Sequence, residues 1–159
     1  MLRVLRHASH ALGGLLFLAL FLVFIVQIAA RFLWSQPLPW TDEAAVILYV
    51  WIILWCAALV VPEREHVAFD LIWNSVSPNA RRLMKALGHV LVGGLAVVAL
   101  PASWDYVQFM AREKSPVLDI SFQWIFLPFV LLLIALVLRS VVGLVQAIRG
   151  KGLDTELRL

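Results

Sequence analysis

Residues 7–30 read HASHALGGLLFLALFLVFIVQIAA and contain no Asp, Glu, Lys or Arg. Because a helix rises about 1.5 Å per residue, ~20 such residues cross the ~30 Å hydrocarbon core of a bilayer. Three more charge-free runs of 19 residues each follow, at 44–62, 86–104 and 120–138. The sequence therefore predicts an all-α integral membrane protein with four transmembrane helices, at about 11–33, 43–62, 83–106 and 120–146.

The composition supports a single membrane domain over residues 1–159. Of the 159 residues, 63% are hydrophobic and 14% are charged, whereas soluble domains have about 45–50% apolar and ~25% charged residues. Cys56 is the only cysteine, so no internal disulfide is expected. These numbers exclude a soluble enzyme, a disordered tail and a disulfide scaffold. We expect residues 11–33 to be a retained span, because they are longer than the apolar part of a signal peptide.

The basic residues predict the orientation. Ten of the 13 Lys and Arg residues lie on the side of the two termini and of the loop between the second and third spans. The other three are Arg31, Arg112 and Lys114. The positive-inside rule therefore predicts that both termini are cytoplasmic.

The first outer loop ends in an acidic pair. Pro37 and Pro39 disfavour a continuing helix there. We expect Thr41 to be the N-cap of the second span, with Asp42 and Glu43 in its first turn, where negative charge suits the helix dipole.

The cytoplasmic loop contains a short amphipathic pattern. Apolar residues with i, i+3, i+4, i+7 spacing at Phe69, Ile72, Trp73 and Val76 predict an interfacial helix over about 66–77. The third span then begins with basic residues suited to anionic lipid, namely Arg81, Arg82 and Lys85.

Few strongly polar side chains fall inside the charge-free runs. Gln27 and Arg31 are four residues apart on one helix face. This pair suits a hydrogen bond between helices, a contact with another subunit or part of a transport path. His89 and Gln123 are the other two such positions.

Two other functions compete at this point. A haem-binding membrane anchor can hold b-type haem between two histidines, but only His89 reaches into a span, so a site with two axial histidines within this chain lacks its second ligand. A proton-coupled exporter needs a carboxylate within a span, and Asp105 lies only at the edge of one. The Cys and His residues lack the spacing of metal ligands, so no metal and no cofactor is expected.

Trp51 and Trp55 lie near the middle of the second span, away from the interfaces that Trp prefers. They are four residues apart, so they share one helix face, and each indole N–H needs a partner. This face suits either packing within the four-helix bundle or docking of another membrane subunit.

Several segments together resemble a known family. Arg31-Phe32, then Pro39-Trp40-Thr41-Asp42-Glu43, then Trp51, then Glu65-His66-Val67-Ala68-Phe69-Asp70 are similar to the small membrane subunit of tripartite ATP-independent periplasmic (TRAP) transporters. Two positions depart from the family pattern, because Glu65 replaces a Gly and Phe69 stands where Val is commoner. The resemblance extends to size and to the number of spans.

The resemblance implies a scaffold subunit of the bacterial inner membrane. It would anchor a large elevator-type subunit that takes up an organic acid with sodium, delivered by a periplasmic binding protein. Under this hypothesis Arg31 pairs with Asp42 or Glu43, and Trp40 anchors the turn between the first two spans at the membrane surface. His66 would form a hydrogen bond with Asp70. Trp51 and Trp55 would face the large subunit. The substrate is not specified by the sequence.

Overall fold

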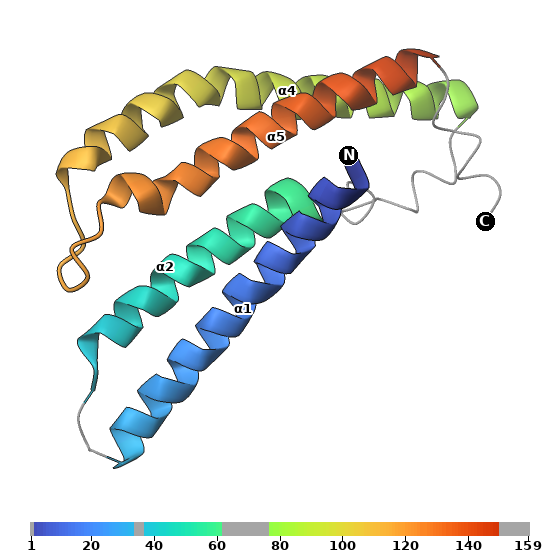
Figure 1. Cartoon of the computed structure of the whole chain (residues 1–159). Helices are drawn as coiled ribbons and strands as arrows, with labels where there is room; N and C mark the ends of the chain where they lie inside the picture. Colours follow the sequence, from blue (N-terminus) through green and yellow to red (C-terminus); the bar gives the residue numbers. More distant parts are fainter. Residues whose placement is uncertain (1, 34–36, 62–76, 150–159) are drawn as a thin grey trace. The chain divides into compact units, whose positions relative to one another are not determined.

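The computed structural model describes residues 2–33, 37–61 and 77–149. Within these ranges the chain is almost entirely helical (Figure 1). The elements are α1 (Leu2–Leu33), α2 (Pro39–Trp55), a π-helical turn η1 (Cys56–Val60), α4 (Pro78–Phe109), a 3₁₀ turn η3 (Met110–Arg112) and α5 (Phe122–Arg149).

The four predicted spans are confirmed as four helices that are long and apolar enough to cross a membrane. They cover His7–Leu33, Pro39–Val60, Ala80–Arg112 and Phe122–Ala147. No β-strand occurs in the described ranges, where the only pairing of this kind is an isolated bridge between Lys114 and Ser121. The predicted interfacial helix over 66–77 lies outside the described residues, apart from Ser77.

The chain divides into two compact units, Met1–Val61 with Ser103–Leu132 and Pro62–Ala102 with Leu133–Leu159. In the first unit α1 and α2 form an antiparallel pair (Figure 1). The buried residues along this pair are mostly small: Ser9, Gly13 and Ala30 on α1, and Ala45 and Ala58 on α2 and η1. Small side chains let helix backbones approach closely in a membrane, where packing rather than water exclusion holds helices together.

The start of α2 corrects one prediction. Thr41 is not the N-cap, because the helix already begins at Pro39 and its N-cap is Leu38. Proline suits the first helical position, since its fixed φ is already helical and no N–H is lost there. The Thr41 side chain is fully buried and its hydroxyl donates to the Leu38 carbonyl at 2.6 Å.

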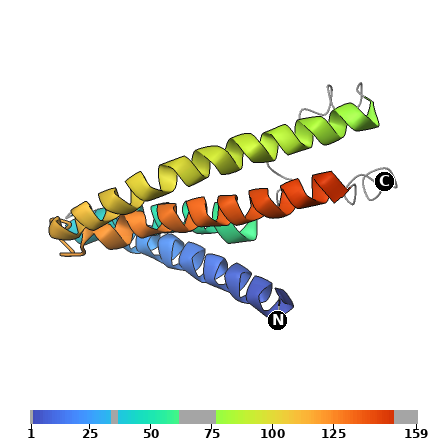
Figure 2. The same cartoon turned by 90° about the horizontal axis from the view of Figure 1, so that it is seen from above.

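The second unit contains Pro78–Ala102 of α4 and the part of α5 after Leu132, which lie side by side (Figure 2). Two glycines allow the close contact. A Cβ on Gly93 would lie 2.6 Å from the Cβ of Ser140, and a Cβ on Gly143 would lie 2.3 Å from the His89 ring. His89 therefore packs against the α5 backbone.

Candidate functional site

Near the start of α2, just beyond its first turn, a carboxylate binds backbone groups far along the chain. Glu43 Oε2 accepts hydrogen bonds from the N–H groups of Val117 at 3.0 Å and Leu118 at 2.9 Å. Its second oxygen, Oε1, is buried and has no hydrogen-bond partner within the described part of the chain. Glu43 thus joins α2 to the connection between η3 and α5.

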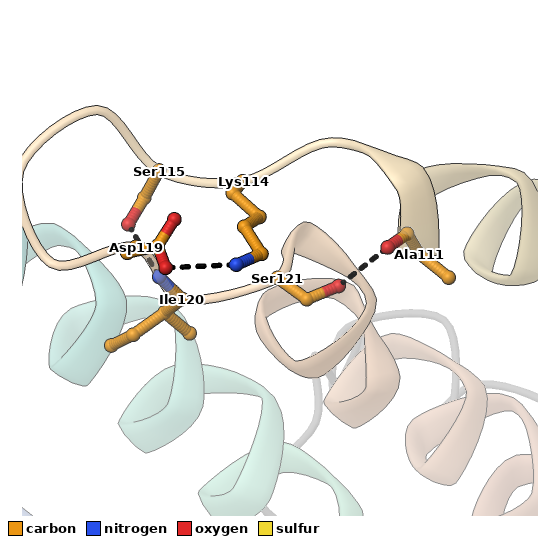
Figure 3. Close-up of polar contacts among 6 residues, drawn as sticks. All are labelled: Ala111, Lys114, Ser115, Asp119, Ile120 and Ser121. Carbon is orange, nitrogen blue, oxygen red and sulfur yellow. Dashed lines mark hydrogen bonds and ion pairs between the residues drawn. The ribbon is translucent and has the colours of Figure 1, made fainter.

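That connection, residues 113–121, is closed by its own hydrogen bonds (Figure 3). The Ser115 N–H donates to the Ile120 carbonyl at 2.9 Å, and the Ile120 N–H donates to the Ser115 hydroxyl at 3.1 Å. The Ser121 hydroxyl donates to the Ala111 carbonyl at 3.2 Å. Ser115 is buried, so the loop has a small polar core of its own.

Asp119 makes the sharp reversal in this loop. Its φ of 54° lies in the left-handed region, which Asp tolerates better than most residues because its short polar side chain bonds locally. The Asp119 carboxylate pairs with Lys114 Nζ at 2.8 Å, and both side chains are largely exposed (Figure 3). An exposed pair of this kind adds little stability, so the backbone bonds and Glu43 carry most of the loop's order.

Aromatic packing holds the two helix ends beside the loop. Tyr106 near the end of α4 meets Phe126 in α5 edge-on, with ring centroids 5.6 Å apart. Val107, one residue further along α4, is 1% exposed.

Asp42 accepts a hydrogen bond from the Gln27 side chain, which ties α1 to α2. This contact matches the first of the three roles considered for Gln27. Arg31 is exposed, and the one ion pair found within the described ranges, Lys114–Asp119, does not join it to Asp42 or Glu43. The hydrogen-bonding side chain at this end of α1 is therefore Gln27, one turn before Arg31.

Trp51 reaches from α2 to α5. Its indole Nε1–H donates to the Trp124 carbonyl at 3.1 Å. In an α-helix that carbonyl would accept from the N–H four residues later, but position 128 is a proline inside α5. Proline has no N–H, so the indole supplies the donor that the helix itself lacks.

Trp55 reaches from α2 to α1. Its Nε1–H donates to the Ser9 carbonyl at 3.2 Å. The residue four positions after Ser9 is Gly13, and Trp55 Cδ1 lies 4.0 Å from where a Cβ on Gly13 would stand. That distance is an ordinary van der Waals contact, and the Gly13 N–H keeps the helical bond to the Ser9 carbonyl available.

The remaining predicted site residues are dispersed. Trp40 is the second residue of α2 and is 39% exposed. Arg81, Arg82 and Lys85 follow one another along the first turns of α4, with Arg82 exposed and the other two half-buried. His66 and Asp70 lie outside the described residues.

The arrangement is suited to holding helices together rather than to a reaction. In the part of the chain that the structure describes, no group of three or more His, Cys, Asp or Glu residues is placed to hold a metal ion. The polar side chains Gln27, Glu43, Trp51 and Trp55 each bond another part of the same chain. The sequence did not predict that loop 113–121 contacts α2, because the contact is made by backbone N–H groups, which every non-proline residue has. The residue pair Ser115-Pro116 indicates only that a turn is favoured there.

Two comparisons with known proteins bear on the family. The chain is 30% identical over 91 residues to the sialic acid TRAP transporter permease protein SiaT of Haemophilus influenzae, covering 57% of this chain and 15% of that protein. It is 23% identical over 97 residues to the C4-dicarboxylate TRAP transporter small permease protein DctQ of Vibrio cholerae, covering 61% of this chain and 42% of that one. The chain thus spans less than half the length of either relative.

The family match covers most of the chain. Residues 20–150 match the DctQ component of tripartite ATP-independent periplasmic transporters, and this region includes loop 113–121 and most of all four spanning helices. This is a family of transporter permease subunits, not of enzymes. The chain is therefore a multi-pass membrane protein of the bacterial inner membrane, and it belongs to the DctQ component family of TRAP transporters.

Proposed function

We propose that this protein is the scaffold subunit of a TRAP transporter, with both termini in the cytoplasm. It anchors a large elevator-type membrane subunit that takes up an organic acid with sodium, and a periplasmic binding protein delivers the substrate. The observation that carries the proposal is a set of hydrogen bonds within the chain. The side chains of Gln27, Glu43, Trp51 and Trp55 each connect one helix to another helix or to a loop. All four contacts lie within the unit made of Met1–Val61 and Ser103–Leu132, and they support a rigid unit there.

The relatives support a larger membrane partner. The aligned region makes up only 15% of the Haemophilus permease protein, so in that protein a segment similar to this chain is joined to much more protein. The two relatives are named for the transport of sialic acid and of a C4-dicarboxylate, both organic acids, which supports an organic acid as the substrate class. They differ from each other, so neither is assigned here.

Co-purification tests the scaffold role. The protein, tagged and expressed with the products of its neighbouring genes, should retain a large membrane subunit in mild detergent. Proteoliposomes with that complex and the binding protein should take up the acid only with an inward sodium gradient. A small subunit that purifies alone, from cells in which the large subunit is shown to be present, would contradict the proposal.

Arg31→Glu tests the predicted interface at the end of α1. Arg31 is exposed beside Phe32, which is 80% exposed, in the last turns of α1. Reversing the charge should lower uptake, either with the complex intact or with part of it dissociated. Gln146→Glu, an exposed change at the opposite end of the spans, is the matched control. If uptake and assembly are unchanged in Arg31→Glu, Arg31 does not contribute to an interface with another subunit.

Labelling tests the orientation. In a Cys56→Ala background, a cysteine at Val117, which is 49% exposed, should react with a membrane-impermeant maleimide added outside intact spheroplasts. A cysteine at Arg82 should react only after lysis. The reverse pattern would show that the termini are periplasmic.

A further inference from the structure

Arg139 lies inside a spanning helix rather than at its end. The charge-free run 120–138 stops just before it, but α5 continues to Arg149 and its apolar span continues to Ala147. At about 1.5 Å per residue, Arg139 is about 12 Å from the Ala147 end of the span. A cation at this depth is costly, and by default it indicates a functional partner such as an anion.

Two contacts show which residues of α4 and α5 lie side by side. A Cβ on Gly93 would meet the Ser140 side chain, and a Cβ on Gly143 would meet the His89 ring. The order of these pairs makes the two helices antiparallel (Figure 2). Arg139 is therefore level with the residue that follows Gly93, further from the start of α4 than His89.

Helical spacing places Lys85 and Arg139 on the same rim of this seam between α4 and α5. Lys85 is four residues before His89, and Arg139 is four residues before Gly143. Since each residue turns the helix by about 100°, each cation lies about 40° to one side of its contact residue, and in an antiparallel pair those two sides coincide. Both side chains are half-buried. At a depth between them, a Cβ on Gly88 would meet nothing within 4 Å, so space is open there.

The charge of this unit is one-sided. Its described ranges, 77–102 and 133–149, contain five Arg and Lys residues and no Asp or Glu. The described ranges of the other unit, 2–33, 37–61 and 103–132, contain five Arg and Lys residues and five Asp and Glu residues. A ligand that complements the open rim is therefore an anion.

The position of the rim in the membrane identifies the kind of anion. A free phosphate or a nucleic acid is excluded from hydrocarbon because a charge is costly there, whereas a phospholipid carries its phosphate on apolar acyl chains. Val92 on α4 and Val142 on α5 flank the rim and are 47% and 55% exposed, so acyl chains have an apolar surface beside the cations. Basic crevices between spanning helices bind anionic headgroups such as that of cardiolipin.

We propose that the rim formed by Lys85, Gly88 and Arg139 binds one anionic phospholipid with two phosphates, from the leaflet at the start of α4. Lys85 and Arg139 are about 13 Å apart along the seam, a length that two phosphates cover better than one. Arg81, four residues before Lys85, continues the rim toward the headgroups. This site goes beyond the proposed function, and it depends neither on the large subunit nor on which side the termini lie.

Native mass spectrometry of the full chain in detergent tests the site, with cardiolipin, phosphatidylglycerol and phosphatidylcholine as probes. The parent should hold one cardiolipin at concentrations at which phosphatidylcholine adds none, and phosphatidylglycerol, with one phosphate, should bind more weakly than cardiolipin. Each cation removed should weaken cardiolipin binding about fivefold, the scale for one Lys or Arg near anionic lipid. Lys85→Gln/Arg139→Gln should therefore weaken it about 25-fold.

The matched control removes two exposed cations at the other ends of the first and third spans. Arg31→Gln/Arg112→Gln changes the net charge by the same amount, and its affinity for cardiolipin should stay within about twofold of the parent. In phosphatidylcholine nanodiscs, the motionally restricted fraction of spin-labelled cardiolipin should fall in Lys85→Gln/Arg139→Gln and not in the control. If Lys85→Gln/Arg139→Gln fails to fold, as judged by circular dichroism, Lys85→Gln alone should show a loss of about fivefold.

Several results would overturn the proposal. They are equal binding of cardiolipin and phosphatidylcholine by the parent, and equal losses in the two double variants. Equal binding of phosphatidylglycerol and cardiolipin would overturn the two-phosphate headgroup, and competition by inorganic phosphate would show a site for a soluble anion instead. Loss of a co-purified large subunit from Lys85→Gln/Arg139→Gln, with cardiolipin binding unchanged, would assign the rim to that subunit. The lipid measurements use this chain alone, so they are independent of whether the scaffold function holds.

Discussion

Trp51 and Trp55 lie one turn apart on α2, yet their hydrogen bonds meet different needs. Trp51 donates to the Trp124 carbonyl, which Pro128 leaves without its helical donor. Trp55 donates to the Ser9 carbonyl, whose helical donor, the Gly13 N–H, is still present. The same side chain therefore fills a gap in one neighbour and adds a second bond in the other. A missing backbone donor matters most in lipid, where water cannot replace it.

The largest effect is expected from Trp51→Phe. The ring stays apolar and aromatic, but the Trp124 carbonyl loses its donor. The loss of stability should be about 1–2 kcal/mol, near the upper end for hydrogen bonds between membrane helices. Reversible unfolding in mixed detergent micelles measures it. If Trp51→Phe loses no more stability than Trp55→Phe, the two hydrogen bonds do not differ in the way described above.

The next effect is a coupling between Trp51 and Pro128. The substitution Pro128→Ala supplies a backbone N–H that can donate to the Trp124 carbonyl. In that background, Trp51→Phe should therefore cost at least about 1 kcal/mol less than in the parent, a coupling within the range seen for interacting residues. Pro128 is less than 2% exposed, so its replacement has its own packing cost, which the double-mutant cycle subtracts. Additive losses would show that the indole does not replace the missing donor.

The sequence predicted one half of this comparison. The i, i+4 spacing places Trp51 and Trp55 on one face, and the indole N–H groups require partners. Their acceptors lie 73 and 46 positions away, so only the packed helices identify them. Pro128 does indicate that the carbonyl of Trp124, four residues earlier, lacks its helical hydrogen-bond donor. Nothing in the sequence connects that carbonyl to Trp51.

The positions of the helices were more predictable than the hydrogen bonds between them. Charge-free runs located all four spans, because a charge at bilayer depth is costly whatever the neighbours are. Of the acidic pair, Asp42 lies in the first turn of α2 as expected, whereas Glu43 lies just beyond that turn because the helix begins at Pro39. The partners of Glu43 are the backbone N–H groups of Val117 and Leu118. Every non-proline residue has such a group, so no residue type signals the contact. Thr41 failed as a cap because Pro39 starts the helix earlier.

Trp55→Phe should have a smaller effect than Trp51→Phe. The Ser9 carbonyl keeps its helical donor, so only the added bond is lost. The expected cost is about 0.6 kcal/mol, the average for hydrogen bonds between membrane helices. The same unfolding measurement applies. The Pro128→Ala background should leave this cost unchanged, because Ser9 and Pro128 belong to different helices. A dependence on Pro128 would show that the two indoles act as one unit.

The smallest effect is expected at the glycine beside Trp55. In Gly13→Ala the new Cβ would lie 3.5 Å from Cys56 Sγ, 3.7 Å from Val60 Cγ2 and 4.0 Å from Trp55 Cδ1. These are ordinary van der Waals distances, so the methyl group fits without moving the indole, and alanine is the better helix former by up to about 1 kcal/mol. The unfolding free energy should therefore differ from that of Gly14→Ala by less than about 0.5 kcal/mol, because both substitutions gain the same helix propensity, and the Trp55→Phe cost should stay the same in this background. Gly14→Ala, where a Cβ meets nothing within 4 Å, is the matched control. A large loss at Gly13 alone would mean that Trp55 packs more tightly against α1 than these distances allow, and the contrast with Trp51 would then be one of packing rather than of hydrogen bonding.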